Sequence, residues 1–335
     1  MTKKAVIIRG DGTGPELIDC TLQILNSVNP SNIEFIVCDA GNEWWEKNKG
    51  PSLIPSDTLD NLENSDACLK GPTITSIIPD SPRSVAVTLR QKFDLYANVR
   101  PIKSVSSTSP LIDLLCVREA TEGMYSGIGY KIDNDTAVTI RKITRSSCNR
   151  IAKFAFESAT ERKWNSVIAI HKANILRETD DLFLHEINSV SKNYPKIIVE
   201  DYLIDNFAQQ LYKNPERFNQ NVLVSTNLFM DIISEEASAL IGSIGNVYSA
   251  NFGTDYAMFE PAHGSSPKYK GMDKVNPTAT ILSAAWMLRY LGDSISANAI
   301  FNSTEKVIAD NKYVTYDLGG TAKTSEMTSE IIKHL

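Results

Sequence analysis

Short apolar runs that alternate with amphipathic stretches constrain this sequence more than any other feature. The first run, residues 5–8, ends at the glycine-rich turn 10–16 (GDGTGPE), and an amphipathic stretch with a proline near its start follows. This order is typical of a buried strand, a turn and a helix. Further strands are predicted at 33–37 and 67–70, with a helix at 58–64. The alternation predicts an α/β fold with a mostly parallel central sheet, covered by helices on both faces.

The length of 335 residues exceeds the usual size of one domain, so we expect two. The sequence changes in character after a helix predicted at 85–93, and residues 241–260, rich in Gly, Ser and Asn, resemble a loop. These changes predict a discontinuous large domain, 1–98 and 245–335, and an inserted smaller domain, 99–244. In the insert we expect strands at 114–118, 136–143, 167–170, 197–199 and 222–225 and helices at 148–161, 180–191, 205–211 and 232–240. An apolar core helix is expected at 278–291.

Composition excludes several classes of protein. The net charge of -6 and the pI near 5.4 argue against nucleic-acid binding, which needs a clustered basic surface. The five cysteines contain no CxxC pair, which argues against a zinc ribbon or a disulfide framework and favours a reducing cytoplasm. No stretch approaches 18 uninterrupted apolar residues, so we expect no membrane span.

Three carboxylates are candidates for a metal site. Asp231 and Glu235 lie four residues apart at the start of a predicted helix, so they project from one face, and Asp205 begins an earlier helix. Carboxylate oxygens are natural ligands of Mg²⁺ and Mn²⁺. The alternative is that acidic residues in a first helical turn only stabilise the helix dipole.

Four arginines are candidates for binding an anionic substrate: Arg83, Arg90, Arg100 and Arg118. Several lie at predicted strand or helix ends, where a parallel sheet opens its ligand crevice. Arginine grips carboxylates with two parallel hydrogen bonds, so a cluster would suit a polycarboxylate. Each one alone could equally be a solvated surface charge, and spacing does not show whether they converge.

Other segments allow two interpretations each. The GDGTGP turn is not the G-x-G-x-x-G dinucleotide fingerprint, because Pro15 interrupts it. The loop 263–271 (HGSSPKYKG) could cradle a phosphate or be a surface turn. Lys172 and Tyr125 are candidates for proton transfer; the alternatives are a lysine whose stem lies along apolar surface and a tyrosine at the edge of the core.

Seven motifs follow one another along the chain: GDGTGPE (10–16), LKGP (69–72), LRQKFDLYANVRP (89–101), VREATEGMYSG (117–127), HKANIL (171–176), NLFMDIISEEAS (227–238) and FEPAHGSSPKYKGMDKVNPTATILSA (259–284). Together they resemble the β-decarboxylating dehydrogenases, a family that includes isocitrate, 3-isopropylmalate, homoisocitrate and tartrate dehydrogenases. They look most similar to NADP-dependent isocitrate dehydrogenase, and the resemblance covers essentially the whole chain. It implies the two-domain fold of that family, which lacks the classical Rossmann fingerprint.

The resemblance implies a site shared between the two subunits of a homodimer. Mg²⁺ or Mn²⁺ would be held by Asp231 and Glu235 together with Asp205 of the other subunit. Lys172, also from the other subunit, would assist removal of the substrate's hydroxyl proton, and Tyr125 would protonate the product of decarboxylation. The large domain would bind the cofactor, and the inserted domain would carry the metal ligands and the dimer interface.

The substrate is less clearly indicated than the reaction. The resemblance implies that Arg90, Arg100 and Arg118, with Lys172, bind the malate part common to all substrates of the family. Ser84 matches isocitrate enzymes, in which it contacts the γ-carboxylate. Isocitrate, giving 2-oxoglutarate and CO₂, is therefore our first expectation. Ala86 and Val87 resemble isopropylmalate enzymes and keep 3-isopropylmalate and homoisocitrate open.

Two departures leave a further alternative, a silent ligand-binding relative. Glu235 replaces the usual aspartate, and Met230 replaces a glycine before the metal aspartate.

The resemblance favours NADP over NAD. Lys268 and Tyr269 stand where NAD-dependent members carry an acidic residue, and a cation is favourable beside a 2′-phosphate. Tyr316 also matches a tyrosine of NADP-linked enzymes, but Gly320 stands where those enzymes carry an additional arginine. The expected cofactor-binding residues are Thr75, Asn174, Glu260, His263, Gly264, Lys268, Tyr269, Asn276 and Tyr316.

Overall fold

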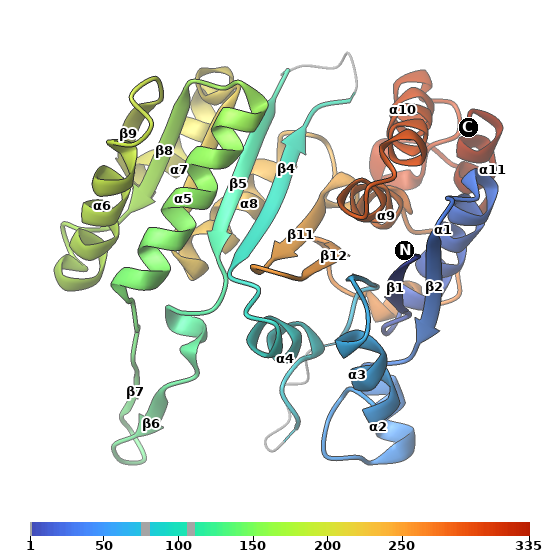
Figure 1. Ribbon diagram of the computed structural model, residues 1–335, viewed down its shortest axis with the longest axis horizontal. Helices are drawn as coiled ribbons and strands as arrows, with labels where there is room; N and C mark the ends of the chain where they lie inside the picture. The colour runs from blue at the N-terminus through green and yellow to red at the C-terminus, as the bar shows by residue number, and fades with distance from the viewer. Residues whose placement is uncertain (1, 75–80, 106–110) are drawn as a thin grey trace. The chain divides into compact units, whose positions relative to one another are not determined.

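The computed structural model describes residues 2–74, 81–105 and 111–335, which form two compact units (Figure 1). The first unit contains the chain up to Phe93 and again from Gly242 onward, together with Val105. The second contains the intervening chain, from Asp94 to Ile241. The predicted domain limits at 98/99 and 244/245 lie within a strand and a 3-10 helix of this structure.

Five strands of the first unit lie in the order β2-β1-β3-β12-β11. Neighbouring strands are parallel except β11 and β12, which are antiparallel. The four residues of β1 from Ala5 to Ile8 are all fully buried, as their continuous apolar run predicts. The strands are β1 (Lys3–Ile8), β2 (Ile33–Cys38), β3 (Ala67–Lys70), β11 (Tyr248–Phe252) and β12 (Ala257–Pro261).

The core of the first unit is built around α9 (Thr278–Tyr290), of which ten of 13 residues are buried. A helix that is apolar on all sides is stable only when it is covered on all sides. Here α9 packs on α10 and α1 and on the β11–β12 side of the sheet. The other helices of this unit are α1 (Gly14–Val28), α2 (Asn42–Asn48), α3 (Ser56–Glu63), α4 (Val85–Lys92), α10 (Ser294–Asp310) and α11 (Thr324–Lys333).

The second unit places five strands in the order β4-β5-β10-β8-β9. Only the pair β4–β5 is antiparallel. Figure 1 shows α5 and α6 on one face of this sheet and α7 and α8 on the other. The elements are β4 (Ala97–Lys103), β5 (Asp113–Glu119), β8 (Ser166–His171), β9 (Ile198–Leu203), β10 (Asn221–Ser225), α5 (Arg145–Arg162), α6 (Arg177–Ser191), α7 (Ile204–Lys213) and α8 (Asn227–Ala239).

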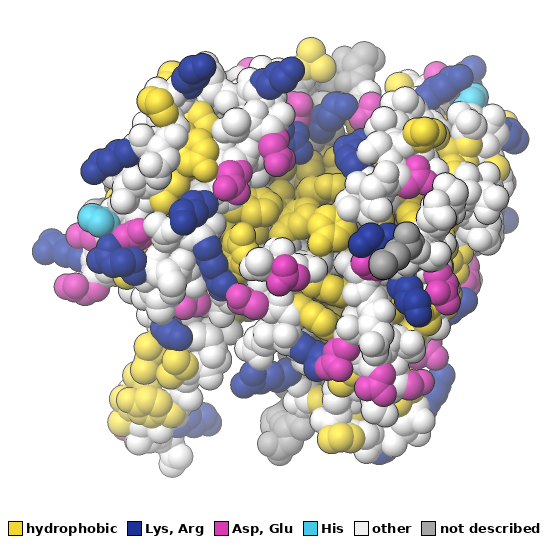
Figure 2. Space-filling view, in the orientation of Figure 1, with side chains coloured by type: hydrophobic (Ala, Val, Ile, Leu, Met, Phe, Trp, Pro, Cys, Tyr) yellow, Lys and Arg dark blue, Asp and Glu magenta, His cyan; other side chains and the backbone are white. Residues whose placement is uncertain are grey.

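A separate antiparallel ribbon, β6 (Gly129–Lys131) and β7 (Ala137–Thr139), extends from the second unit. Figure 2 shows hydrophobic side chains gathered on this ribbon. The exposed fractions are 40% for Ile128, 61% for Tyr130 and 60% for Ile132. Isolated two-stranded ribbons bury little apolar surface of their own and are only marginally stable in water.

The predicted α/β class with a mostly parallel sheet is confirmed, whereas one local prediction is wrong and one helix starts elsewhere than predicted. The expected loop 241–260 contains β11 and most of β12, which form a buried hairpin. The expected helix at 232–240 begins five residues earlier, at Asn227. All five cysteines are free thiols, and no helix in the described residues is long and apolar enough to span a membrane.

Candidate active site

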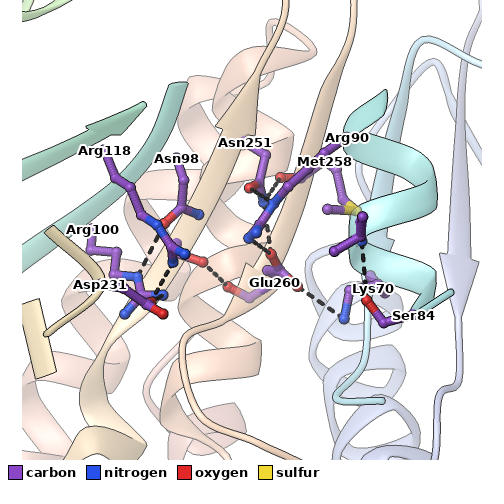
Figure 3. A network of polar contacts seen from close by, with 12 residues as sticks. Lys70, Ser84, Arg90, Asn98, Arg100, Arg118, Asp231, Asn251, Met258 and Glu260 are labelled. Atoms are coloured by element: carbon purple, nitrogen blue, oxygen red, sulfur yellow. Dashed lines mark hydrogen bonds and ion pairs between the residues drawn. The ribbon is translucent and has the colours of Figure 1, made fainter. Parts of the chain in front are cut away.

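The centre of the second unit's polar cluster is Asp231, on α8. Arg118 of β5 is opposite Asn98 of β4 in the sheet register, and Arg100 is two residues along β4. Side chains two residues apart in a strand share a face, so both guanidinium groups point to the side on which α8 packs. Figure 3 shows them reaching Asp231, which accepts hydrogen bonds from Arg100 Nη2 at 3.1 Å and from Arg118 Nη1.

The two arginine side chains are buried, whereas the carboxylates that they contact are partly exposed to solvent. The exposed fractions are 3% for the Arg118 side chain and 8% for Arg100, against 28% for Asp231 and 51% for Glu235. Arg100 Nη1 donates to Glu235 Oε1 at 3.0 Å, so both carboxylates of the predicted pair are engaged by this arginine. Buried cations need such partners, because an unpaired charge is costly in a low-dielectric interior.

Tyr125 completes this cluster from the short 3-10 helix η1 (Met124–Ser126). Its hydroxyl donates to Asp231 Oδ2 at 2.8 Å, and its ring lies 5.1 Å from the Arg118 guanidinium carbon. Burial, followed by the hydrogen bond to Asp231, raises the pKa of Tyr125 above its ordinary value. The phenol is therefore protonated at neutral pH and can act as a proton donor.

Met230, which precedes Asp231, is fully buried in the core. Its burial leaves the Asp231 side chain accessible.

A second polar pair in the same unit joins Lys172 and Asp205. Lys172 directly follows β8, and Asp205 lies in the first turn of α7. The distance from Lys172 Nζ to Asp205 Oδ1 is 2.6 Å, and this hydrogen bond lowers the pKa of Asp205. The backbone N–H of Lys172 donates to the fully buried Asp180 at 2.6 Å, which fixes the start of its loop. Asn174 is exposed in the same loop.

The three predicted metal ligands do not form one group within this chain. Asp231 and Glu235 share Arg100, whereas Asp205 pairs with Lys172. Across residues 2–74, 81–105 and 111–335, no three His, Cys, Asp or Glu side chains are placed to hold one metal ion. The chain therefore presents a pair of carboxylates and a separate lysine–aspartate pair.

In the first unit, Arg90 is held by a buried carboxylate. Arg90 Nε donates to Asn251 at 2.8 Å and its Nη2 to Glu260 at 3.2 Å, while Lys70 Nζ lies 2.9 Å from the other Glu260 oxygen (Figure 3). Burial favours a raised Glu260 pKa, but the charges of Lys70 and Arg90 outweigh it and lower this pKa to about 2. The predicted cofactor residue Glu260 is thus engaged by its own chain.

Ser84 is the N-cap of α4. Its hydroxyl oxygen accepts the backbone N–H of Val87 at 3.3 Å. A hydroxyl that accepts this bond keeps its own hydrogen for donation. The residue is half-buried, and the first-turn residues Ala86 and Val87 are partly exposed beside it.

Four predicted cofactor residues, His263, Tyr269, Asn276 and Tyr316, line one pocket of the first unit. His263 Nε2 is buried and has no hydrogen-bond partner among the described residues, as expected of a group that awaits a ligand. Gly264 is exposed in the loop that follows, and Thr75 lies outside the described residues. The other lining residues are Thr13, Ser243, Ile244, Gly245, Ser266, Val275 and Asp317.

Two tyrosines and two lysines gather beside this pocket. The rings of Tyr269 and Tyr316 lie 5.9 Å apart, and the interaction between their side chains lowers the pKa of Tyr269 and raises that of Tyr316 to about 12. Lys268 Nζ lies 4.8 Å from the centre of the Tyr269 ring, and Lys274 Nζ lies 4.8 Å from that of Tyr316. The pocket therefore has a cationic rim.

Some contributors were not predicted from the sequence. Asn227 accepts from Arg118 Nε at 2.9 Å, and Ser234 accepts from Arg100 at 2.9 Å. Asp317 accepts from Asn276 at 3.0 Å and so holds the pocket wall. Asn227 and Ser234 fall within the 227–238 motif, but spacing alone did not indicate these contacts.

Comparisons with known proteins agree over nearly the whole chain. The family model described as isocitrate/isopropylmalate dehydrogenase matches residues 4–331. Homoisocitrate dehydrogenase of Methanocaldococcus jannaschii is 41% identical, over 99% of this chain and 97% of that protein. 3-Isopropylmalate dehydrogenase of Methanothermobacter thermautotrophicus is 40% identical, over 99% and 98%. The crystal structure of isocitrate dehydrogenase from Methylococcus capsulatus superposes with a TM-score of 0.94 at 37% identity, covering 99% of both chains.

Proposed function

Because the chain belongs to the isocitrate/isopropylmalate dehydrogenase family, it is a metal-dependent β-decarboxylating dehydrogenase, and we propose that it oxidises isocitrate with NADP to 2-oxoglutarate and CO₂. The observation that carries the choice of substrate is Ser84 at the N-terminus of α4. Its hydroxyl hydrogen is available, and a helix N-terminus attracts negative charge. Both properties suit a terminal carboxylate better than an isopropyl group.

We assign the buried arginines to the substrate's remaining carboxylates. Arg100 and Arg118 both pair with Asp231 in the chain alone, so an arriving carboxylate would meet cations that are already oriented. Arg90, aligned by Glu260 and Asn251, is assigned the same role. Preorganised guanidinium groups lose little rotamer freedom on binding, which favours tight capture.

The carboxylates of Asp231, Glu235 and Asp205 fit a divalent ion, because Mg²⁺ and Mn²⁺ prefer oxygen ligands and all three are accessible. When bound, such an ion would polarise the oxygens of the substrate as a Lewis acid. We propose that Asp205 reaches this group from a second copy of the chain. The separation of the two clusters within one chain supports this division of the ligands.

Two side chains are proposed to move protons. Lys172, in its neutral amine form, would take up the substrate's hydroxyl proton, and a bound nicotinamide would supply the hydride acceptor. Asp205 Oδ1 lies 2.6 Å from Lys172 Nζ. Tyr125 gives a proton to the carbon that loses CO₂. Its raised pKa supports this assignment, because the phenol keeps its proton until the carbanionic carbon forms.

The cofactor proposal rests on the cationic rim of the pocket. His263, Asn276 and the two tyrosines provide an aromatic and amide surface that fits an adenosine, and Lys268 provides a positive charge for its 2′-phosphate. We assign Asn174, in the Lys172 loop, to the nicotinamide end.

A homodimer is the proposed assembly. The ribbon β6–β7 presents Tyr130 and Ile132 to solvent, and burying them against a second copy would remove this apolar surface from water. Symmetric pairing is the commonest way in which soluble chains cover such a patch.

3-Isopropylmalate and homoisocitrate are the second candidates. Ala86 and Val87, partly exposed in the first turn of α4, could contact an apolar or a longer substituent. The M. jannaschii and M. thermautotrophicus relatives bear the names of these two activities.

Parallel assays with the three acids, Mn²⁺ and either NADP or NAD test the proposal. We expect the highest kcat/KM for isocitrate with NADP, and a Ser84→Ala enzyme should lose about 10- to 100-fold of it, as for a lost hydrogen bond to a charged group. Asp293→Ala is the matched control, because it also removes an N-cap side chain. The Asp293 carboxylate accepts the backbone N–H of Ser296 at 3.0 Å at the start of α10. A higher kcat/KM for another acid, or an equal loss in the control, would overturn isocitrate as the substrate.

A further inference from the structure

The rim of the cofactor pocket holds a cation that the sequence motifs did not single out, Lys274. Its Nζ lies 4.8 Å from the centre of the Tyr316 ring and 5.6 Å from that of Tyr269. Lys268 Nζ lies 4.8 Å from the centre of the Tyr269 ring. Two ammonium groups thus lie close to this pair of tyrosine rings.

Both lysines are available for a ligand. They are exposed, and among the described residues neither has a carboxylate within ion-pair distance. Lys270, in the same loop, differs because its Nζ is paired with Glu43. Two unpaired ammonium groups beside two phenols match the charge and acceptor oxygens of a phosphate dianion.

Gly320 follows Tyr316 by four residues and has no room for a side chain. A Cβ at this position would lie 2.0 Å from the carbonyl oxygen of Val314. That segment is pinned, because Ala322 N donates to Val314 O at 3.0 Å and Gly320 N donates to Thr315 O at 3.0 Å. No residue with a side chain fits at position 320 unless the backbone moves. This position therefore does not supply a second cation, and one would come from another element.

We propose that Lys274 is the second cationic ligand of the cofactor's 2′-phosphate and, with Lys268, sets the preference for NADP. This inference rests on the proposed NADP function. Lys274 precedes α9 by four residues, in a segment whose neighbours Val275 and Asn276 line the pocket. Its ammonium group would shift from the ring of Tyr316 to the phosphate, a small movement of a flexible side chain.

Binding of adenosine 2′-monophosphate and adenosine 5′-monophosphate to the full-length protein, measured by calorimetry, tests the assignment. Lys274→Met should weaken binding of the 2′-isomer about 10- to 100-fold and leave the 5′-isomer unchanged, because only one charge-assisted contact is removed. Lys268→Met should act in the same way, whereas Lys270→Met should change neither affinity. In turnover, Lys274→Met should raise the KM for NADP with little change in kcat.

The outcomes separate the two claims. Equal affinity of the unmodified protein for the two isomers would overturn the NADP proposal and the role of Lys274 with it. Preference for the 2′-isomer that Lys268→Met abolishes and Lys274→Met keeps would overturn only the role of Lys274. A variant that fails to fold would also lose its affinity for the 5′-isomer, whereas the assignment requires that affinity to be unchanged.

Discussion

At the scale of single residues, Glu260 is a carboxylate whose charge has structural consequences. It is 7% exposed and carries three partners, Lys70, Arg90 and Asn251. The two cations are almost as deeply buried, with exposed fractions of 3% and 11%. Each charge in this group therefore depends on the others, and removal of the carboxylate leaves two cations without compensation.

We predict that Glu260→Gln lowers the free energy of unfolding at pH 7 by about 3–5 kcal/mol, because it leaves buried cations unpaired. Glu63→Gln, which breaks a surface pair with Lys92, should cost less than about 1 kcal/mol. Urea unfolding of the three proteins measures both effects. Equal costs for the two variants would contradict the prediction.

The same substitution makes a prediction about pH. The folded-state pKa of Glu260, about 2, lies below its ordinary value of 4.5, so its contribution is complete above 4.5 and is lost as the pH falls towards 2. The difference in unfolding free energy between the unmodified protein and Glu260→Gln should shrink across this window. A difference that stays constant down to pH 2 would show that folding does not lower the pKa of this carboxylate.

Arg90 and Glu260 were named from the sequence as site residues, whereas Lys70, Asn251 and the contacts among the four were not. The contact between Arg90 and Glu260 spans 170 residues, and no spacing rule connects positions so far apart. Arg100 and Arg118 converge on Asp231 because β4 and β5 pair in a particular register. Lys274 was overlooked for the same reason, since its proximity to Tyr316 depends on how two loops fold together.

At the scale of elements, strands with continuous apolar runs were predictable and polar ones were not. β1 (KKAVII) and β8 (SVIAIH) were found from such runs. β11 (YSANF) contains Ser, Ala and Asn, which are weak strand formers, yet Ser249, Ala250 and Asn251 are buried in the sheet. Its conformation is fixed by pairing with β12, so tertiary context overrides local preference there.

The ribbon β6–β7 carries an element-scale prediction. Replacing Tyr130 and Ile132 together by Glu should raise the dissociation constant of the proposed dimer about 100-fold or more, because two exposed apolar anchors become charged. Sedimentation at several protein concentrations measures the change. Ile295→Glu is the control, since this side chain is 86% exposed on α10. A dimer that persists in the double variant would place the interface elsewhere.

At the scale of the whole molecule, the proposed site residues of the second unit form two separate polar clusters. The Asp231 cluster holds two carboxylates, two arginines and Tyr125, and the other cluster holds Lys172 with Asp205. The family's reaction needs both a metal site and a proton acceptor. We have proposed that two copies of the chain supply these parts to each other.

Mixed dimers of two inactive variants, Asp231→Asn and Lys172→Met, test this account most directly. If the site is shared, one of the two sites in each mixed dimer contains both substitutions and the other contains neither. Random mixing then restores about a quarter of the activity of the unmodified enzyme with isocitrate, NADP and Mn²⁺, because half of the dimers are mixed and each has one intact site. If each chain builds its own site, every site carries one substitution, and a mixture as inactive as its parents would contradict the account.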